Sequence, residues 1–307
     1  MIEDIASVIL PVFVMAGIGY AINRRGFRLD TEAIGRLVLL VGTPALVFSS
    51  LTSPDIPQAS LSGPVSAALL ATGIAAVLGA LFLLAIRQPV RAFVSSLALP
   101  NSGNMGLPIV LLAFGQQGLA NGVAFFFVIA LVQYIFVPVI MDGNFSLGRV
   151  LREPLVYALI AVFIFRATDS VPHEIITRST HLLGGMVIPL MVILLGYSLA
   201  GLQVSDLRLA LVLALARLVI GIIAGLIVIH LLGLTGIVAG CVFLMAAMPC
   251  AMVIYLFALR YNRAPRRIAG LVVVSTLMTF AALPGLLVVG IALSEGAVPL
   301  DLLTGQW

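Results

Sequence analysis

The sequence comprises 307 residues, of which 62% are hydrophobic and 9% are charged, and its mean hydropathy is +1.23. Soluble domains contain about 45–50% apolar and about 25% charged residues, so the composition excludes a soluble protein and indicates an integral membrane protein. The net charge of +4 does not indicate a nucleic-acid partner, because all 16 basic residues are arginines spread over short loops, as membrane-orientation signals are.

Apolar runs of about 20 residues, separated by short loops, predict an all-α protein with about ten membrane-spanning helices. The acidic start of the chain precedes Arg24 and Arg25, which is the reverse of a secretory signal, so the first helix is expected to be retained. In chain order, the predicted helices are Ile5–Ile22, Thr31–Leu51, Leu61–Ile86, Val90–Phe114, Gly118–Met141, Pro154–Phe165, Ile176–Leu199, Leu207–Leu232, Thr235–Ala258 and Ile268–Leu293.

The fourth predicted helix contains a polar segment, Leu99–Pro108, that cannot continue as a regular helix. It holds two prolines, Pro100 and Pro108, together with two glycines and two asparagines. Proline removes a backbone donor and clashes with the preceding turn, so we expect two half-helices joined by an unwound link. Irregular backbone at membrane depth is tolerated where it packs in protein or lines a polar cavity, so this link is a candidate binding site.

Arginines are distributed unequally between the alternate loops of this helix assignment. Thirteen of the 16 arginines fall in loops or at helix ends on one side of the membrane. The loops and helix ends on the opposite side contain only Arg166 and Arg178, and Arg217 lies within a helix. Because cytoplasmic loops are richer in arginine, both termini are predicted on the non-cytoplasmic side of the cell (inner) membrane. The richer side receives Arg24, Arg25, Arg28, Arg36, Arg87, Arg91, Arg149, Arg152, Arg208, Arg260, Arg263, Arg266 and Arg267.

Three proline landmarks recur at nearly the same offset along the chain. Pro44 is followed by Pro189 after 145 positions, and Pro138 by Pro284 after 146, while Pro100 is followed after 149 by Pro249, which would break the ninth helix. This pattern predicts two five-helix repeats, residues 1–153 and 154–307, and an odd number of helices inverts the second repeat. Chance placement of prolines in membrane helices is the alternative.

The two breaks together favour an anion site. New half-helices are expected to begin near Gly106 and near Cys250, and the free N–H groups of two helix starts attract a carboxylate without a basic side chain. The asparagine amides would add donors, or would only cap the half-helices. The predicted substrate-binding residues are Asn101, Ser102, Gly103, Asn104 and Gly106 from the first break, and Met248, Pro249, Cys250 and Ala251 from the second.

Arg217 is the one charge placed deep in a predicted helix. Intramembrane charges usually face a cavity or a partner, so we expect Arg217 to attract or balance the anion. Pairing with helix-end carbonyls is the alternative.

None of the Asp and Glu residues lies in the middle of a predicted span, which disfavours a cation antiporter. Metalloprotease and aspartyl-protease patterns are absent from the sequence, so we expect no enzyme, no metal site and no cofactor. A coupling ion, Na⁺ or H⁺, stays open. An anion channel also stays open, because broken helices line channels too.

At these residues the chain resembles the auxin efflux carrier family, whose bacterial members are described as permeases for malonate and similar carboxylates. The motifs that carry the resemblance are Thr43-Pro44-Ala45-Leu46-Val47-Phe48, Asn101-x-Gly103-x-x-Gly106-Leu107-Pro108, Gly184 to Leu199, Met248-Pro249, and Ser275-Thr276-Leu277 leading to Leu283-Pro284.

The resemblance implies a bile-acid-symporter-like fold in which broken helices four and nine cross. It implies a scaffold, residues 5–51 plus 154–199, and a moving transport domain, residues 61–141 plus 207–293. It also implies that Asn101 and Asn104 face the substrate and that a homodimer forms through the scaffold. The chain departs from the family at Cys250–Ile254, where an apolar run replaces a common asparagine.

The sequence therefore predicts a secondary transporter that moves a small organic anion, such as a carboxylate, by an elevator-like motion. A sodium-coupled organic-anion symporter and an anion channel are the alternatives.

Overall fold

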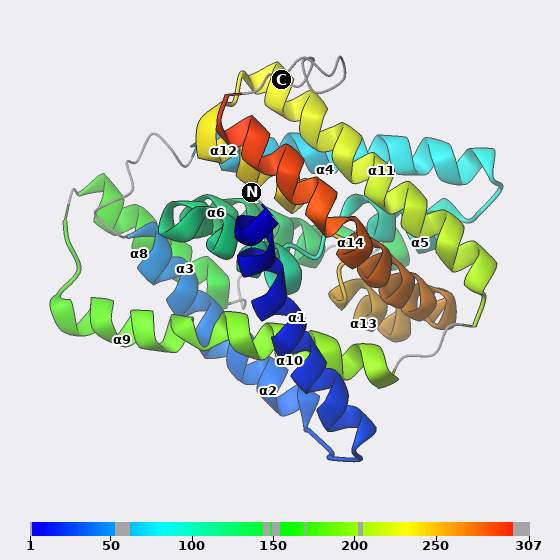
Figure 1. Cartoon of the computed structure of the whole chain (residues 1–307), viewed down its shortest axis with the longest axis horizontal. Coiled ribbons are helices and arrows are strands. Elements are labelled where there is room, and N and C mark those ends of the chain that lie inside the picture. The colour runs from blue at the N-terminus through cyan, green and yellow to red at the C-terminus, as the bar shows by residue number, and fades with distance from the viewer. Residues whose placement is uncertain are drawn as a thin grey trace.

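The computed structural model is built of helices and describes residues 2–52, 62–143, 148, 154–168, 170–201 and 205–296 (Figure 1). Helix accounts for 86% of the structure, and no β-strand occurs in these ranges. By length and composition, six helical stretches can cross a membrane, in agreement with an all-α integral membrane protein. They are Thr31–Leu51, Ser62–Ala85, Ser102–Asp142, Glu174–Gly201, Leu207–Leu232 and Pro265–Ser294.

The helices of the first half follow the predicted apolar runs, and two of them are divided into shorter elements. The predicted second helix is continuous but divided into three segments, and the predicted fourth helix is interrupted after residue 98. The elements are α1 (Ile2–Arg24), α2 (Thr31–Leu37), η1 (Val38–Gly42), α3 (Thr43–Leu51), α4 (Ser62–Ala85), α5 (Val90–Ala98), η3 (Ser102–Gly106) and α6 (Leu107–Asp142).

In the second half, the predicted seventh and ninth helices each consist of two elements, and α11 has the predicted bounds. The elements are α8 (Pro154–Ala167), α9 (Glu174–Gly185), α10 (Val187–Gly201), α11 (Leu207–Leu232), α12 (Gly236–Ala247), α13 (Val253–Arg260) and α14 (Pro265–Ser294). Leu61, Arg149 and Arg152 lie outside the described residues, as do residues 297–307. The sidedness of the termini stays a prediction.

Two π-helical turns, η1 and η3, each stand directly before a proline in the first turn of the next helix, Pro44 in α3 and Pro108 in α6. Proline cannot donate into the preceding turn, and a wider turn relieves the clash of its ring. Pro108 therefore lies in the first turn of the half-helix that follows the interrupted segment Leu99–Pro108.

Gly115 divides α6 into two arms. Its dihedral angles, φ 63° and ψ −152°, are open to glycine and strained for other residues. A Cβ atom on Gly118 would overlap the carbonyl oxygen of Val110, so the second arm folds back against the first at backbone contact. This reversal falls between the predicted fourth and fifth helices.

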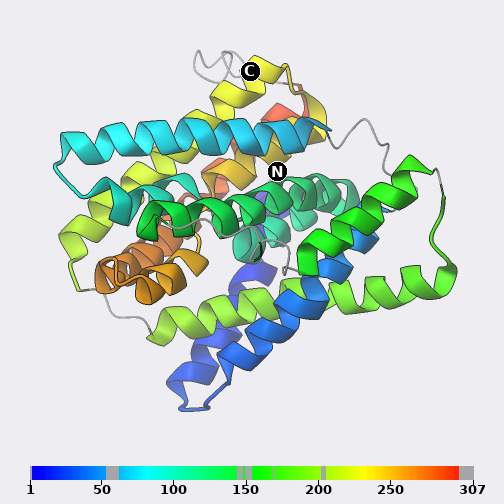
Figure 2. The same cartoon turned by 180° about the vertical axis from the view of Figure 1, so that it is seen from behind.

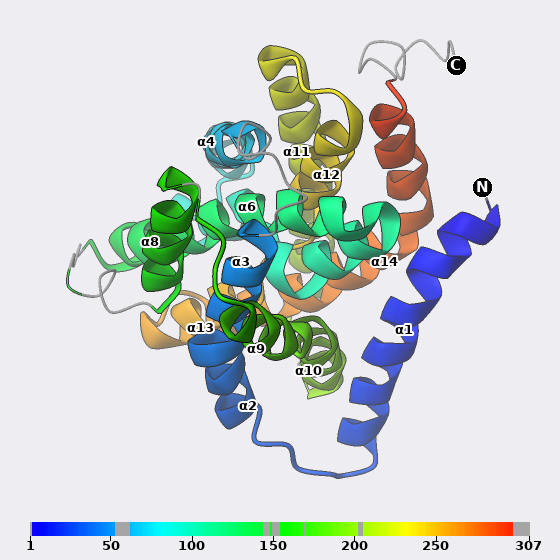
Figure 3. The same ribbon diagram turned by 90° about the vertical axis from the view of Figure 1, so that its left-hand side faces the viewer.

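The most extensive packing occurs within two groups of helices. Figure 3 shows α6 between α4, α11 and α12 on one side and α2, α9 and α10 on the other. Figure 2 shows the molecule from behind the view of Figure 1. Helix group one comprises α1, α2, η1, α3, α8, α9 and α10, and helix group two comprises α4, α5, η3, α6 and α11 to α14.

Glycines bring helices to backbone contact inside each group. A Cβ atom on Gly19 of α1 would overlap the carbonyl oxygen of Ile193 in α10, and one on Gly221 of α11 would overlap that of Ala246 in α12. Such contacts let large helix faces interlock, as small residues do in membrane proteins. Each group is therefore tightly joined internally.

Gly19→Ala is expected to lower the thermal unfolding midpoint of the detergent-solubilised protein strongly, because α1 and α10 must separate to admit the methyl group. Gly17→Ala is the matched control on the same helix, since a Cβ atom there meets nothing within 4 Å. Alanine raises helix propensity by about 1 kcal/mol over glycine, so the control should be neutral or slightly more stable. Equal midpoints for the two variants would contradict the proposed contact.

Candidate functional site

The two unwound links lie against each other at the centre of helix group two. Asn101 N–H donates to the carbonyl oxygen of Pro249 at 2.7 Å, and Ala251 N–H donates to that of Leu99 at 3.2 Å. These bonds form an antiparallel bridge between Pro100 and Cys250. Unwinding leaves backbone N–H and C=O groups without partners inside their own helix. Each unwound link supplies hydrogen-bond partners for such groups in the other link, and these bonds stabilise irregular backbone in an apolar environment.

The half-helices begin at other residues than the sequence suggested. The first starts at Ser102 rather than near Gly106, because the Asn101 carbonyl already accepts from the N–H groups of Met105 and Gly106 at 3.3 and 3.1 Å. The first N–H group that bonds within this half-helix is that of Met105, so the N–H groups of Ser102, Gly103 and Asn104 lie before the first internal bond.

The second half-helix, α13, starts at Val253 rather than near Cys250. Cys250 N–H donates to Ser275 Oγ at 3.2 Å, and the first helical bonds run from Ile254 and Tyr255 to the carbonyls of Ala251 and Met252. The helix start at Met252 and Val253 is therefore available to a ligand.

A cavity of about 260 Å³ lies between the two helix groups and receives both helix starts. The described lining contains no charged side chain. Helix group two contributes Pro100, Asn101, Ser102, Gly103, Asn104, Phe126, Ala130, Gln133, Tyr134, Ala251, Met252, Val253 and Leu256. Helix group one contributes Thr31, Gly35, Val38, Leu39, Thr43, Leu155, Met191, Leu194 and Ser198.

Three buried polar atoms of this lining have no hydrogen-bond partner among the described residues: Asn101 Nδ2, Ser102 Oγ and Thr43 Oγ1. Asn101 is 4% exposed and Ser102 is 1% exposed. Buried polar groups are nearly always hydrogen-bonded, so three orphan groups around one cavity make it the candidate place of a polar ligand, while the four other orphan atoms, on Ser95, Ser96, Asn121 and Arg217, lie outside this lining. Asn104 is half-buried and also lines the cavity.

Pro100, Gly103 and Ala251 also line the cavity, whereas Gly106, Met248, Pro249 and Cys250 do not. Met248 and Cys250 are fully buried beside Pro249. Gly106 serves packing, because a Cβ atom there would lie 2.6 Å from Met245 Sδ. The sequence analysis did not identify the remaining lining residues as site residues, among them the polar or polarisable side chains of Thr43, Gln133, Tyr134, Met191 and Ser198. Three of them carried a signal in the sequence, because Thr43 precedes the landmark Pro44, and Met191 and Ser198 lie in the motif Gly184 to Leu199.

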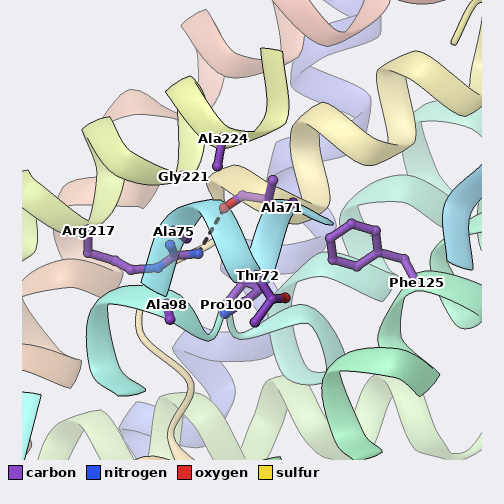
Figure 4. A pocket seen from close by; sticks show the side chains of 10 residues that line it. Ala71, Thr72, Ala75, Ala98, Pro100, Phe125, Arg217, Gly221 and Ala224 are labelled. Atoms are coloured by element: carbon purple, nitrogen blue, oxygen red, sulfur yellow. Dashed lines mark hydrogen bonds between the residues drawn. The ribbon is translucent and has the colours of Figure 1, made fainter. Parts of the chain in front are cut away.

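Arg217, on α11, does not line this cavity but lines a much smaller one, of about 10 Å³, that shares Pro100 with it. Its Nη1 donates to the carbonyl oxygen of Leu97 and its Nη2 to that of Ala246, both at 2.8 Å. Figure 4 shows the side chain extending beside Ala75, Ala98 and Pro100. The guanidinium therefore joins the carboxyl ends of α5 and α12, whose dipoles attract a cation. Arg217 therefore makes the pairing with helix-end carbonyls that the sequence analysis gave as the alternative, and its role toward the anion stays a prediction.

Arg217→Gln is expected to destabilise the fold by about 2–5 kcal/mol, because it leaves buried helix-end carbonyls without charged donors. It should lower the affinity for charged and neutral ligands alike. Thermal unfolding in detergent measures the first effect and ligand titration the second. The control is Arg178→Gln, which removes an exposed pair with Glu174 and should change stability by less than about 1 kcal/mol. If Arg217→Gln weakened the binding of anionic ligands but not of neutral ones, Arg217 would act on the ligand and the structural role would be contradicted.

Comparison with known proteins identifies one family. A family model described as "Membrane transport protein" matches residues 4–146 and 143–287, which together span most of the chain. A search of curated proteins finds no match.

Proposed function

The chain belongs to the membrane transport protein family, which includes auxin efflux carrier-like members, and from this and the cavity we propose a secondary transporter of small organic anions such as carboxylates. The observation that supports an anionic substrate is the convergence of two helix starts with the unpartnered donors Asn101 Nδ2 and Ser102 Oγ at one cavity. Each helix start is equivalent to about half a positive charge, so the two together suit one carboxylate.

We further propose ten spans arranged as two inverted repeats, residues 1–153 and 154–307. In this arrangement helix group one is the scaffold, residues 5–51 plus 154–199, and helix group two is the transport domain, residues 61–141 plus 207–293. The concentration of packing within each group supports this division. The cavity lies where the groups meet, so an elevator-like shift of the transport domain would carry the ligand with the crossing. We expect a homodimer through the scaffold, in the inner membrane.

The proposal is tested by thermal unfolding of the purified protein with carboxylates and their isosteric amides, for example benzoate against benzamide, and malonate and malate. We expect at least one carboxylate to raise the unfolding midpoint and its amide to leave the midpoint unchanged, because only the carboxylate complements the helix starts. Labelled uptake of the stabilising carboxylate into proteoliposomes then tests transport. Stabilisation by no carboxylate, or equally by carboxylate and amide, would contradict the anion site.

Two alternative functions are compatible with the same fold, and one measurement distinguishes each of them from the proposed transporter. A sodium-coupled symporter would lose uptake when choline replaces sodium. An anion channel would show single-channel conductance in a planar bilayer, and its anion flux would not saturate as that of a transporter does.

A further inference from the structure

A separate cavity, of about 280 Å³, is lined by helix group two alone. Its walls are α4, the second arm of α6, and α5 with Leu99 that follows it. Apart from Thr72 and Ser95 the lining is apolar, and two of its members, Leu69 and Phe136, are 55% and 53% exposed. Exposed apolar side chains of a membrane protein face lipid, so this cavity, called here the lipid-side cleft, opens to the bilayer.

Ser95 places an unpartnered hydroxyl in this apolar cleft. The residue is buried, and its Oγ has no hydrogen-bond partner among the described residues. Thr72, the other polar residue of the lining, donates instead to the carbonyl oxygen of Ala68 at 2.7 Å. Because buried polar groups are nearly always hydrogen-bonded, the Ser95 hydroxyl indicates a ligand that brings an acceptor atom to this point.

Arg91 places a positive charge one helical turn from Ser95. The two residues are four positions apart on α5, so they share a face of the helix and are separated by about 5.4 Å along its axis. Arg91 is exposed in the first turn of α5, and it takes part in none of the ion pairs within the described ranges. A cation, a hydroxyl and an apolar cleft therefore follow one another along a single face.

This order of groups matches the chemistry of a phospholipid. An acyl chain is complementary to the apolar walls, an ester carbonyl can accept from the Ser95 hydroxyl, and the phosphate, a few bonds from the ester, can pair with Arg91. Basic side chains beside clefts between membrane helices favour anionic headgroups over zwitterionic ones, because a zwitterionic headgroup brings its own positive charge near the arginine.

We propose that the lipid-side cleft is a binding site for one anionic phospholipid of the surrounding bilayer. The acyl chain packs on Ala98 and Leu99, and the Leu99 carbonyl accepts from Ala251 N–H at the crossing of the two links. The bound lipid therefore supports the crossing from the bilayer. This site is independent of the proposed anion site, which lies in another cavity.

The first test measures binding of phosphatidylglycerol and of phosphatidylcholine with the same chains to the purified, delipidated protein, by native mass spectrometry. We expect phosphatidylglycerol to bind about fivefold more tightly, as one basic side chain near an anionic lipid provides. Arg91→Gln should remove this preference. The matched control is Arg208→Gln, because Arg208 is also exposed and is the second residue of its helix, α11. Equal binding of the two lipids, or an equal loss of preference in the control, would overturn the proposal.

The second test fills the cleft. Gly73 lines it, and a Cβ atom there meets nothing within 4 Å, so Gly73→Leu should fold and should weaken the binding of both lipids. Gly17→Leu is the matched control, since a Cβ atom on Gly17 also meets nothing within 4 Å and Gly17 lies on α1, outside the cleft. Unchanged lipid binding by a folded Gly73→Leu protein would overturn the proposal.

The third test locates the acyl chain. Phe136→Trp places a fluorophore in the cleft lining, and Phe163→Trp places one on α8, where Phe163 is 73% exposed and outside the cleft. In phosphatidylcholine vesicles with a small share of phosphatidylglycerol carrying brominated chains, quenching should be greater in the Phe136→Trp protein. Equal quenching in the two proteins would overturn the proposal. These outcomes do not involve carboxylate binding or transport, so they leave the proposed function untouched.

Discussion

Replacing Asn101 with aspartate is expected to abolish carboxylate binding, with a loss of at least about 100-fold. The substitution keeps the shape of the side chain but replaces the orphan donor Nδ2 with a carboxylate oxygen. The ligand then loses a hydrogen bond to a charged group, worth about 1.5–3 kcal/mol, and also meets a like charge in a poorly solvated cavity. Equilibrium binding of the best carboxylate to the purified protein measures the effect.

Two variants separate this effect from unfolding. Asn101→Ala removes the donor without adding a charge and should weaken binding by about 10–100-fold. Asn121→Ala is the matched control, because Asn121 is also buried, its Nδ2 donates to the Gln117 carbonyl, and it does not line the cavity. Its affinity should equal that of the unmodified chain. Tight carboxylate binding by a folded Asn101→Asp protein would contradict the site.

Cross-linking the two helix groups is expected to stop transport and to preserve ligand binding. Phe13 of α1 and Phe280 of α14 meet across the boundary between the groups, with their ring centroids 4.7 Å apart. Cysteines at both positions, joined by a short bifunctional thiol reagent, would hold the groups together, and an elevator-like shift requires them to slide. Uptake into proteoliposomes and equilibrium binding are measured before and after cross-linking.

The control pair lies inside helix group one. Phe48 of α3 and Phe165 of α8 have ring centroids 5.7 Å apart, and their cross-link should leave uptake intact. The native Cys241 and Cys250 are buried and should not react. Loss of free thiols confirms each cross-link. Undiminished uptake with the Phe13–Phe280 positions fully cross-linked would contradict movement between the groups.

The elements that sequence reasoning predicts well are those with strong local signals. Apolar length sets the bounds of α11, and the prolines mark both breaks, because a missing donor and a ring clash act within one turn. The reversal at Gly115 also falls between two predicted helices. These effects depend on neighbouring residues alone.

Features that depend on distant residues were not predictable in the same way. The second half-helix starts later than predicted because Ser275, 25 residues away, accepts from the Cys250 N–H. Arg217 could be recognised as a buried charge, but its partners lie 120 and 29 residues away. The wall formed by Thr43, Met191 and Ser198 exists only after the two helix groups meet.

The most direct test of the anion site is the anomalous diffraction of crystals grown with a bromobenzoate. We predict one bromine peak per chain in the cavity, beside Met191 and Leu194, with the carboxylate density directed to Asn101 and Ser102. A bromine peak in another cavity, such as the one of about 900 Å³ beside Pro108 and His181, with this cavity unoccupied, would contradict the account.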